Sequence, residues 1–399
     1  MTSFPPALVL KGSFGLSPKG RQLRNALIGV QYVASFGLII GATFMYLQNY
    51  YMQNTPLGYD KDEIIITNMN NNIRKSRDAF ASQVKSFSGI EEVTYAEMLL
   101  SSQDQYMGWG RKYRDKDIQF QCLPVEPSFL KVMNVKISEG RDFREEDKAK
   151  RYGTFVFNER ARTEYGLEIG SLIDSMEIVG FMPDVKFASF RTEVTPMAFF
   201  VWGTNNWGNQ PNYAYIKVKA GSDLRGAMQH VKTTLQSFDP EYPFNVRFFD
   251  EVLNGLYEKE RSLSSLITLF SLIAIFISVV GVFGLVVFDS EYRKKEIGIR
   301  KVLGSTTEEI IVMFNKTYIR ILCVCFVLGA PIAGYVVHRW LENFAYKTPM
   351  YWWVYLIAFA IIAVITILTV TFQNWRAANE NPVHSIKNCL LYTSDAADD

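Results

Sequence analysis

The sequence SLSSLITLFSLIAIFISVVGVFGLVVF, residues 262–288, contains no Asp, Glu, Lys or Arg. Its length exceeds the roughly 20 residues that an α-helix needs to cross a hydrocarbon core about 30 Å thick. A helix on the surface of a soluble protein would show a polar stripe with a period of about 3.6 residues, and this stretch shows none. We therefore predict a transmembrane helix over 262–288. The alternative is a long buried helix of a soluble protein.

Three further stretches carry no charge: residues 25–59, 321–338 and 348–375. Aromatic residues gather at their ends, as amphipathic rings do at headgroup depth; they are Tyr46, Tyr50, Tyr51, Trp340, Tyr351, Trp352, Trp353 and Trp375. The stretch 321–338 contains Pro331, which would kink a helix but is tolerated in membranes where neighbours satisfy the freed carbonyl. A signal peptide is the alternative for the first, but its apolar run is too long and no cleavage site follows it. We interpret it as a retained anchor.

The average composition conceals these segments. With 42 Lys and Arg against 40 Asp and Glu, the formal charge of the 399 residues is +2, and the mean hydropathy is +0.02. Balanced charge and only four Cys exclude a disordered chain and a disulfide-rich scaffold. A net charge of +2 over 399 residues also excludes a strongly basic nucleic-acid-binding protein.

The distribution of basic residues predicts the orientation. Residues 1–24 hold four Lys or Arg and no acid, and residues 289–320 hold seven Lys or Arg against five acids. The positive-inside rule then places both termini and the 289–320 loop in the cytoplasm and everything between the first two spans outside. The four predicted spans are residues 25–48, 262–288, 321–338 and 351–375. Outside the membrane we predict a domain with a stalk helix, residues 49–261, and a short loop, residues 339–350. In the cytoplasm we predict an N-terminal segment 1–24, a loop 289–320 and a C-terminus 376–389, which a tail 390–399 follows.

The extracytoplasmic segment alternates β-type and helical patterns, which predicts a mixed α+β domain of one or two lobes. Predicted strands cover residues 63–68, 118–125, 154–157, 176–182, 197–202, 213–218 and 244–249. Predicted helices cover residues 77–87, 128–132, 158–165 and 224–238, with Asn158 and Asp223 as N-caps. A last helix begins near Asp250 and is expected to continue without a break into the second span, leaving about half of its roughly 57 Å as a stalk.

We recognise no catalytic constellation, metal site or cofactor site in this domain; a glycosidase-like pair among its many carboxylates is the alternative to a solvated acidic face. It holds one His, His230, and one Cys, Cys122, whereas a catalytic triad or a zinc site needs more. The segment 202–212 contains Trp202, Asn206 and Trp207 among Gly and Asn residues, and it is expected to be an exposed loop between two strands. It is either a binding tip or a plain long hairpin.

The cytoplasmic loop contains EIGIRKVLGS at residues 296–305. Gly304 can end one helix in the left-handed conformation, and Ser305 with Glu308 forms a capping box that would start the next. We predict a sharply turned helical elbow with charges and exposed apolar residues. A basic amphipathic helix that lies on the lipid surface is the alternative.

This motif after a membrane span resembles the cytoplasmic signature of the FtsX/MacB-type permeases of ABC transporters. The resemblance extends to GFMPDVKF at 180–187 with TPM at 195–197, and to AANENPVHSIK at 377–387. It implies four transmembrane α-helices with a large α+β extracytoplasmic (MacB-like periplasmic core) domain between spans 1 and 2. It also implies a non-catalytic permease subunit of the cell inner membrane that transmits conformational change for efflux, for lipoprotein or peptide handling, or for mechanotransmission.

By position, the resemblance assigns coupling to an ATPase to residues of the elbow, namely Glu296, Gly298, Arg300, Lys301 and Gly304. The expected partners are a cytoplasmic ABC ATPase, a second permease unit, the lipid membrane and a periplasmic adaptor or hydrolase, with no nucleic acid. The chain's nearest approach to a phosphate loop, GLSPKGRQ at 15–22, lacks the required Lys-Ser/Thr. The alternative function is a membrane-anchored sensor or scaffold that binds a ligand outside; an anchored hydrolase is disfavoured by the missing His, Cys and metal spacings.

Two features of the ends concern the origin of the chain. PALVLK at 6–11 and PVHSIK at 382–387 share the pattern P-x-x-x-[LI]-K, which is expected if this is the second half of a tandem eight-span permease. Residues 390–399 place three Asp on the predicted inner face and are interpreted as a non-native tail.

Overall fold

A computed structural model describes residues 18–100, 107–186, 190–205, 211–255, 257–292, 299–300 and 303–378. The chain forms two compact units. The helical unit comprises Met1–Tyr51, Glu260–Asn343 and Lys347–Asp399, and the α+β unit comprises Met52–Lys259 and Phe344–Tyr346. Each unit has its own core.

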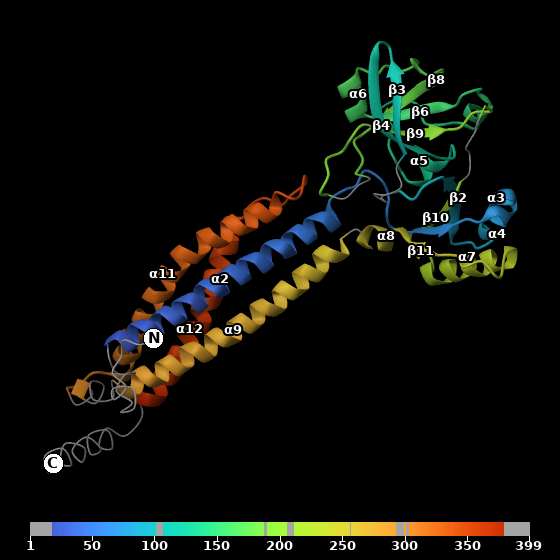
Figure 1. Ribbon diagram of the computed structural model, residues 1–399. Helices are drawn as coiled ribbons and strands as arrows, with labels where there is room; N and C mark the ends of the chain where they lie inside the picture. Colours follow the sequence, from blue (N-terminus) through green and yellow to red (C-terminus); the bar gives the residue numbers. More distant parts are fainter. Residues whose placement is uncertain are drawn as a thin grey trace, which may run out of the picture. The chain divides into compact units, whose positions relative to one another are not determined.

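The helical unit is built from four long helices (Figure 1), with bounds α2 (Pro18–Asn54), α9 (Glu258–Tyr292), α11 (Thr307–Leu341) and α12 (Trp352–Ala378). All four are long and apolar enough to cross a membrane. The four predicted apolar helices are thus confirmed, although α11 is nearly twice as long as the expected 321–338 and runs through Pro331. Membrane helices accommodate such a proline.

The four helices pack through large apolar side chains and small residues. Phe36 of α2 is fully buried, with its ring centroid 5.2 Å from that of Phe326 on α11 and 6.4 Å from that of Phe359 on α12. Gly329 allows α11 to approach α2 so closely that an added Cβ would lie 3.4 Å from the Cα of Val33. Small residues at such crossings are typical of membrane bundles, where close backbone packing replaces the hydrophobic driving force.

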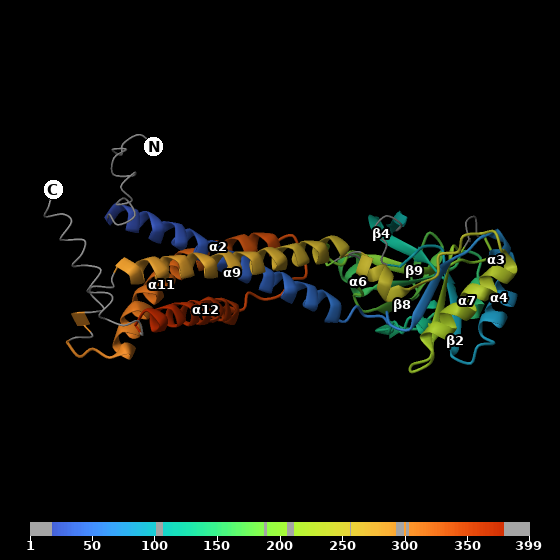
Figure 2. The ribbon, with the colours of Figure 1, turned by 90° about the horizontal axis from the view of Figure 1, so that it is seen from below.

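The first sheet of the α+β unit has four antiparallel strands in the order β11-β1-β10-β2. Their bounds are β1 (Ile64–Asn68), β2 (Ile90–Ala96), β10 (Tyr213–Val218) and β11 (Arg247–Phe248). Three helices contribute buried residues to the core on one face: α3 (Asn71–Lys75), α4 (Arg77–Val84) and α7 (Leu224–Phe238). Helices α4 and α7 lie side by side beside this sheet (Figure 2).

The second sheet has seven strands of mixed direction, in the order β3-β4-β9-β6-β8-β5 with β7 paired to β8. Their bounds are β3 (Met107–Tyr113), β4 (Lys116–Pro124), β5 (Glu139–Gly140), β6 (Thr154–Asn158), β7 (Leu172–Ile173), β8 (Met176–Met182) and β9 (Met197–Val201). Its side chains alternate between two apolar cores. Phe155 and Phe157 join one core, with α6 (Glu159–Tyr165), and Val156 joins the other.

The core on the Val156 side is shared between the two sheets. Tyr215 of β10 is fully buried there, and its hydroxyl accepts a hydrogen bond from the Leu100 N–H at 2.7 Å. Phe129 of α5 (Phe129–Val132) packs against both Tyr215 and Phe199, with ring centroids 5.1 and 5.6 Å away. The two lobes expected from the sequence are therefore two sheets with a common core.

Most predicted elements of this unit are confirmed, and β8, β10 and α7 have the predicted bounds. The predicted strand 244–249 is wrong in extent, because only β11 is a strand and Phe249 already begins α8 (Phe249–Gly255). Strands β2, β3, β5 and β7 and helix α3 were not predicted.

The expected unbroken stalk is also wrong. Helix α8 ends at Gly255 and α9 begins at Glu258. Glycine weakens a helix interior, and next to it Tyr257 makes tertiary contacts: its hydroxyl accepts from the Phe190 N–H at 3.1 Å. The chain therefore turns at this point, and the second span starts as a separate helix.

A buried carboxylate holds one turn of the α+β unit. Asp147 is only 1% exposed, and its two oxygens accept from the Arg141 guanidinium, each at 2.8 Å. The Arg144 N–H donates a third bond at 2.8 Å. Burial by itself would raise the pKa of Asp147, but these bonds outweigh it and hold the pKa below its usual range.

This carboxylate should contribute pH-dependent stability. Because the pKa is lower in the folded chain than in the unfolded one, the contribution is present above about pH 4 and is lost as pH falls through the folded value. We expect Asp147→Asn to destabilise the α+β unit by about 2 kcal/mol at pH 7, with the difference from wild type shrinking below about pH 4. Thermal unfolding of the full chain in detergent, followed by tryptophan fluorescence, measures both effects.

Glu145→Gln, on the exposed side of the same turn, is the control and should change stability by less than about 0.5 kcal/mol. A difference between wild type and Asp147→Asn that stays constant from pH 7 to pH 3 would contradict the assignment.

Candidate functional site

The turn before α11 is closed by a helix-ending motif. Gly304 has a φ of +95°, outside the range that other residues readily adopt. The Ser305 N–H donates to the Arg300 carbonyl at 2.9 Å, and the Leu303 N–H donates to the Ile299 carbonyl at 3.0 Å. A bond spanning five residues next to a left-handed glycine is the pattern with which helices commonly end. The predicted left-handed conformation of Gly304 is confirmed.

The next helix starts one residue later than predicted. Thr306, not Ser305, is the N-cap: its hydroxyl accepts from the Glu309 N–H at 3.3 Å, and the Glu309 carboxylate accepts from the Thr306 N–H at 3.1 Å. The sequence offers both registers. The Ser305 N–H is already engaged in ending the preceding helix, so the capping box moves to Thr306 and Glu309.

Two large apolar side chains are exposed at this elbow. Leu303 is 80% exposed and Ile299 is 61% exposed. They are four residues apart, a spacing that places side chains on one face of a helix, and Arg300 beside them is exposed as well. We call Ile299, Arg300 and Leu303 the elbow surface.

Of the predicted coupling residues, the structure describes Arg300 and Gly304, both exposed. Glu296, Gly298 and Lys301 lie outside the described residues. Leu303 was not among the predicted site residues, although an apolar residue at this spacing from Ile299 in a charged loop is a usable signal. The elbow offers a partner protein apolar contact area and a guanidinium, which is the chemistry of a docking surface.

The predicted outer binding loop is wrong at Trp202. This side chain is only 8% exposed; its indole N–H donates to the Glu97 carboxylate at 2.6 Å, and its ring lies 4.8 Å from that of Phe200. Its aromatic surface is used in the core beside the seven-stranded sheet. Asn206 and Trp207 lie outside the described residues.

The predicted hairpin at this loop is also wrong. Strand β9 before it belongs to the seven-stranded sheet, and β10 after it belongs to the four-stranded sheet. The start of the crossing is fixed by backbone bonds from Thr204 to Lys150 and from Asn205 to Arg151, both 2.8 Å. The chain passes here from one sheet to the other.

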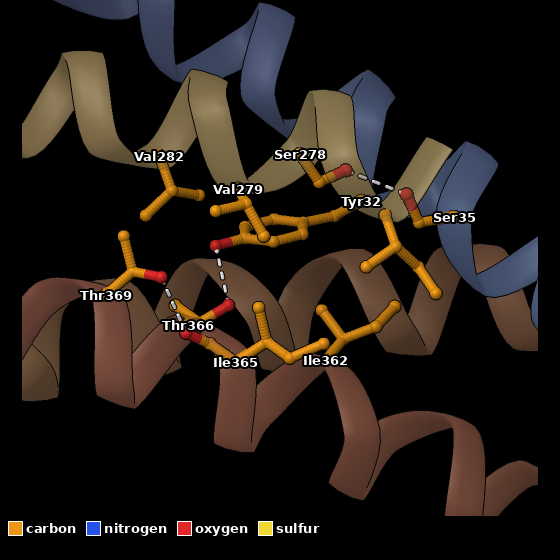
Figure 3. Close-up of a pocket in the computed structure, with 10 residues that line it drawn as sticks. Tyr32, Ser35, Ser278, Val279, Val282, Ile362, Ile365, Thr366 and Thr369 are labelled. Carbon is orange, nitrogen blue, oxygen red and sulfur yellow. Dashed lines mark hydrogen bonds between the residues drawn. The ribbon is translucent and has the colours of Figure 1, made fainter. Parts of the chain in front are cut away.

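A polar layer links three of the apolar helices (Figure 3). Tyr32 of α2 shares a hydrogen bond of 3.0 Å with Thr366 of α12, and Ser35 of α2 shares one of 2.8 Å with Ser278 of α9. A cavity of about 10 Å³ lies between these side chains, at the lower limit of the space one water molecule needs. We call Tyr32, Ser35, Ser278 and Thr366 the polar layer.

The single His and Cys of the α+β unit have structural surroundings. His230 bonds through its Nε2 to the Gln83 carbonyl at 3.0 Å and stacks on Phe87, with centroids 5.5 Å apart. Cys122 lies fully buried among aromatic residues, and this burial raises the pKa of its thiol. In the part of the chain that the structure describes, no cluster of three His, Cys, Asp or Glu side chains could hold a metal ion.

Comparisons with known families decide the identity. The sequence model of the MacB-like periplasmic core domain matches residues 28–234, about half of the chain, and that of the FtsX-like permease C-terminal domain matches residues 268–382. The chain belongs to the MacB/FtsX-like family of ABC transporter permeases. The first match covers most of the first span and of the α+β unit, and the second covers most of the second span, the elbow and the last two spans; residues 235–267 lie between the two matches.

Curated relatives of this MacB/FtsX-like permease carry the name macrolide export ATP-binding/permease protein MacB. That of Chromobacterium violaceum is 23% identical over 230 residues, and that of Escherichia coli strain K12 is 23% identical over 233 residues. Each match covers 55% of this chain but 35% of the relative, so the chain matches about a third of the length of these relatives.

Among solved structures, the periplasmic region of MacB from Actinobacillus actinomycetemcomitans is 13% identical, with a TM-score of 0.36 over 50% of this chain and 95% of that one. The extracellular domain of the transporter YknZ from Gram-positive bacteria is 11% identical, with a TM-score of 0.33 over 46% of this chain and 99% of that one.

The capping assignment at the elbow can be tested directly. We expect Thr306→Ala to weaken the first turn of α11 by about 1 kcal/mol, because the Glu309 N–H loses its acceptor. Ser305→Ala should have no comparable effect. Hydrogen–deuterium exchange of peptides covering residues 303–312 should accelerate in the first variant only. Faster exchange in Ser305→Ala with no change in Thr306→Ala would instead support the register first expected from the sequence.

Proposed function

We propose that this chain is a permease subunit that transmits conformational change from a cytoplasmic ATPase to its α+β unit. Permeases of this family work with ABC ATPases. The observation that supports the coupling role is the elbow surface: two large apolar side chains stand exposed beside Arg300, in a turn fixed by Gly304 and by the Thr306 cap. Exposed apolar side chains beside a capped helix start suit docking to a partner protein.

The orientation that we propose places the elbow in the cytoplasm and the α+β unit outside. Residues 289–320 carry seven Lys or Arg against five acids, and residues 1–24 carry four Lys or Arg with no acid. Short loops rich in basic residues stay on the cytoplasmic side. The match of the α+β unit to a periplasmic core domain supports the same arrangement.

The proposed route of transmission runs along α9, since this helix extends from Glu258, after the end of α8, to Tyr292, before the elbow. Within the bundle, α9 is joined to α2 by the bond between Ser35 and Ser278, and α2 is joined to α12 through Tyr32. Hydrogen bonds between membrane helices contribute about 0.6 kcal/mol each on average. The polar layer would keep the helices in register while a force acts on one of them.

The remaining partners follow from the exposed face of the bundle. α9 exposes many apolar side chains, among them Leu269, Phe270, Phe276 and Phe283. In a membrane this face contacts lipid or a second permease unit, and we propose both. Because curated relatives are named for macrolide export, efflux is the transport class we propose. We also propose a periplasmic adaptor or hydrolase as a partner of the α+β unit.

If the elbow surface docks on the ATPase, charged substitutions in it should weaken the complex. The chain is co-expressed with the ABC ATPase encoded nearest to its gene, and complex formation and ATP hydrolysis are measured in detergent. We expect the double variant Ile299→Asp with Leu303→Asp to weaken the complex at least tenfold and to abolish stimulation of hydrolysis, since both side chains would be desolvated at the interface.

Leu172→Asp makes the same chemical change at an exposed leucine of the α+β unit and serves as the control. Full binding and stimulation by the double variant would refute the coupling role. Failure of the unmodified chain to bind that ATPase would favour the sensor or scaffold function instead.

The orientation yields a separate prediction. All four Cys are first replaced by Ser. In intact spheroplasts, a membrane-impermeant maleimide should then label Leu172→Cys and leave Leu303→Cys unlabelled, because the two exposed positions are on opposite sides of the membrane. After the membrane is permeabilised, both should react. Labelling of Leu303→Cys from outside would reverse the proposed orientation.

A further inference from the structure

The α+β unit contains a pocket at the two points where the chain enters it from α2 and leaves it for α9. Its volume is about 40 Å³. Its lining combines charged and apolar side chains, of which the following matter here: Gln53, Leu57, Lys61, Lys186, Asp250 and Leu253. All of them belong to the α+β unit itself.

The pocket is lined by more positively charged than negatively charged side chains. Lys61 and Lys186 contribute two ammonium groups, and Asp250 contributes one carboxylate, giving a formal charge of +1. The Lys61 ammonium donates to the Gln53 carbonyl at 2.7 Å, which fixes it at the pocket without neutralising it. The pocket therefore has a net attraction for one negative charge.

The positive charge of Lys186 is compensated less by its neighbours than that of Lys61. The Lys186 ammonium lies 5.1 Å from the ring centroid of Phe190 and 4.8 Å from that of Tyr346, and among the described residues no acidic side chain acts on its pKa. Two aromatic faces replace part of its hydration. Burial lowers the pKa of Lys186 from its usual value, with no acidic neighbour to offset this. A bound anion would supply the missing charge.

The position of the pocket along the helices suggests the source of that anion. Gln53 is six residues beyond Leu47, where the apolar run of the first span ends, and Tyr257, also in the lining, is six residues before Leu263, where the second begins. Six residues of helix span about 9 Å, which reaches the outer edge of a headgroup layer about 5 to 8 Å thick. Tyr46 and Tyr50, stacked with centroids 6.5 Å apart, precede the pocket on α2. Such rings favour the interface.

We propose that this pocket binds the phosphodiester of a phospholipid headgroup, with Lys186 and Lys61 around the phosphate and with Leu57 and Leu253 against its apolar part. A phosphodiester carries one negative charge, which matches the net charge of the pocket. Inorganic phosphate is a mixture of monoanion and dianion at neutral pH, and Asp250 opposes the second charge of the dianion. This proposal does not depend on coupling to an ATPase, because it uses only the lining of the pocket and the depth of α2 and α9.

The experiment uses the full chain in detergent after removal of lipid, with native mass spectrometry as the readout. Phosphatidylglycerol is titrated into wild type, Lys186→Gln and Lys61→Gln. We expect binding of the first lipid molecule to weaken at least tenfold in Lys186→Gln and to be restored in Lys186→Arg, which keeps the charge. Lys232→Gln, an exposed position on α7, is the matched control and should bind as wild type does.

Each outcome decides the proposal. Equal lipid binding by wild type, Lys186→Gln and Lys61→Gln overturns it. Competition by millimolar inorganic phosphate that displaces the lipid shows that a free anion is the ligand and overturns the lipid assignment. If Lys186→Gln does not fold, as judged by thermal unfolding, Lys61→Gln decides alone: retained binding refutes the site, and a tenfold loss supports it.

Discussion

The structure depends on one constraint, which is that hydrocarbon offers no hydrogen bonds to a polypeptide. A charge-free stretch in that environment must satisfy its N–H and C=O groups internally, and a helix does so. The same constraint pairs the polar side chains that remain: Tyr32 with Thr366 and Ser35 with Ser278. Where α2 and α9 leave the apolar region, ammonium and carboxylate groups appear, and the lipid-binding pocket that we propose lies at this boundary.

The α+β unit is stiffened by the core that its two sheets share. Tyr215 from one sheet and Phe199 from the other both pack on Phe129, so neither sheet can rotate without disrupting the same buried contacts. Protein interiors are close-packed and transmit displacement instead of absorbing it. A unit of this kind is suited to receive a movement delivered at its entry points, as the proposed permease function requires.

Helix α9 connects the two features to which we assign function. Tyr257 of the pocket lies just before its first residue, Glu258, and the elbow surface follows its last, Tyr292. A helix is stiff along its axis because each turn is hydrogen-bonded to the next. In the function that we propose, the ATPase would act at the Tyr292 end of α9 and the lipid would bind at its Glu258 end.

The sequence alone determined the elements whose signals are local. Charge-free length identified four apolar helices, short runs rich in β-branched or aromatic residues identified β8 and β10, and Gly304 and Asp223 marked helix ends, since each signal depends on neighbours in the chain. Tertiary structure decided the rest. Strand β2 carries two glutamates and β3 two glycines, so both become strands through their pairing with β10 and β4. Trp202 is buried because Glu97, far away in sequence, accepts its N–H. The helix breaks at Gly255 beside Tyr257, whose hydroxyl bonds to Phe190. In each case the deciding partner is distant along the chain, and only folding brings it into contact.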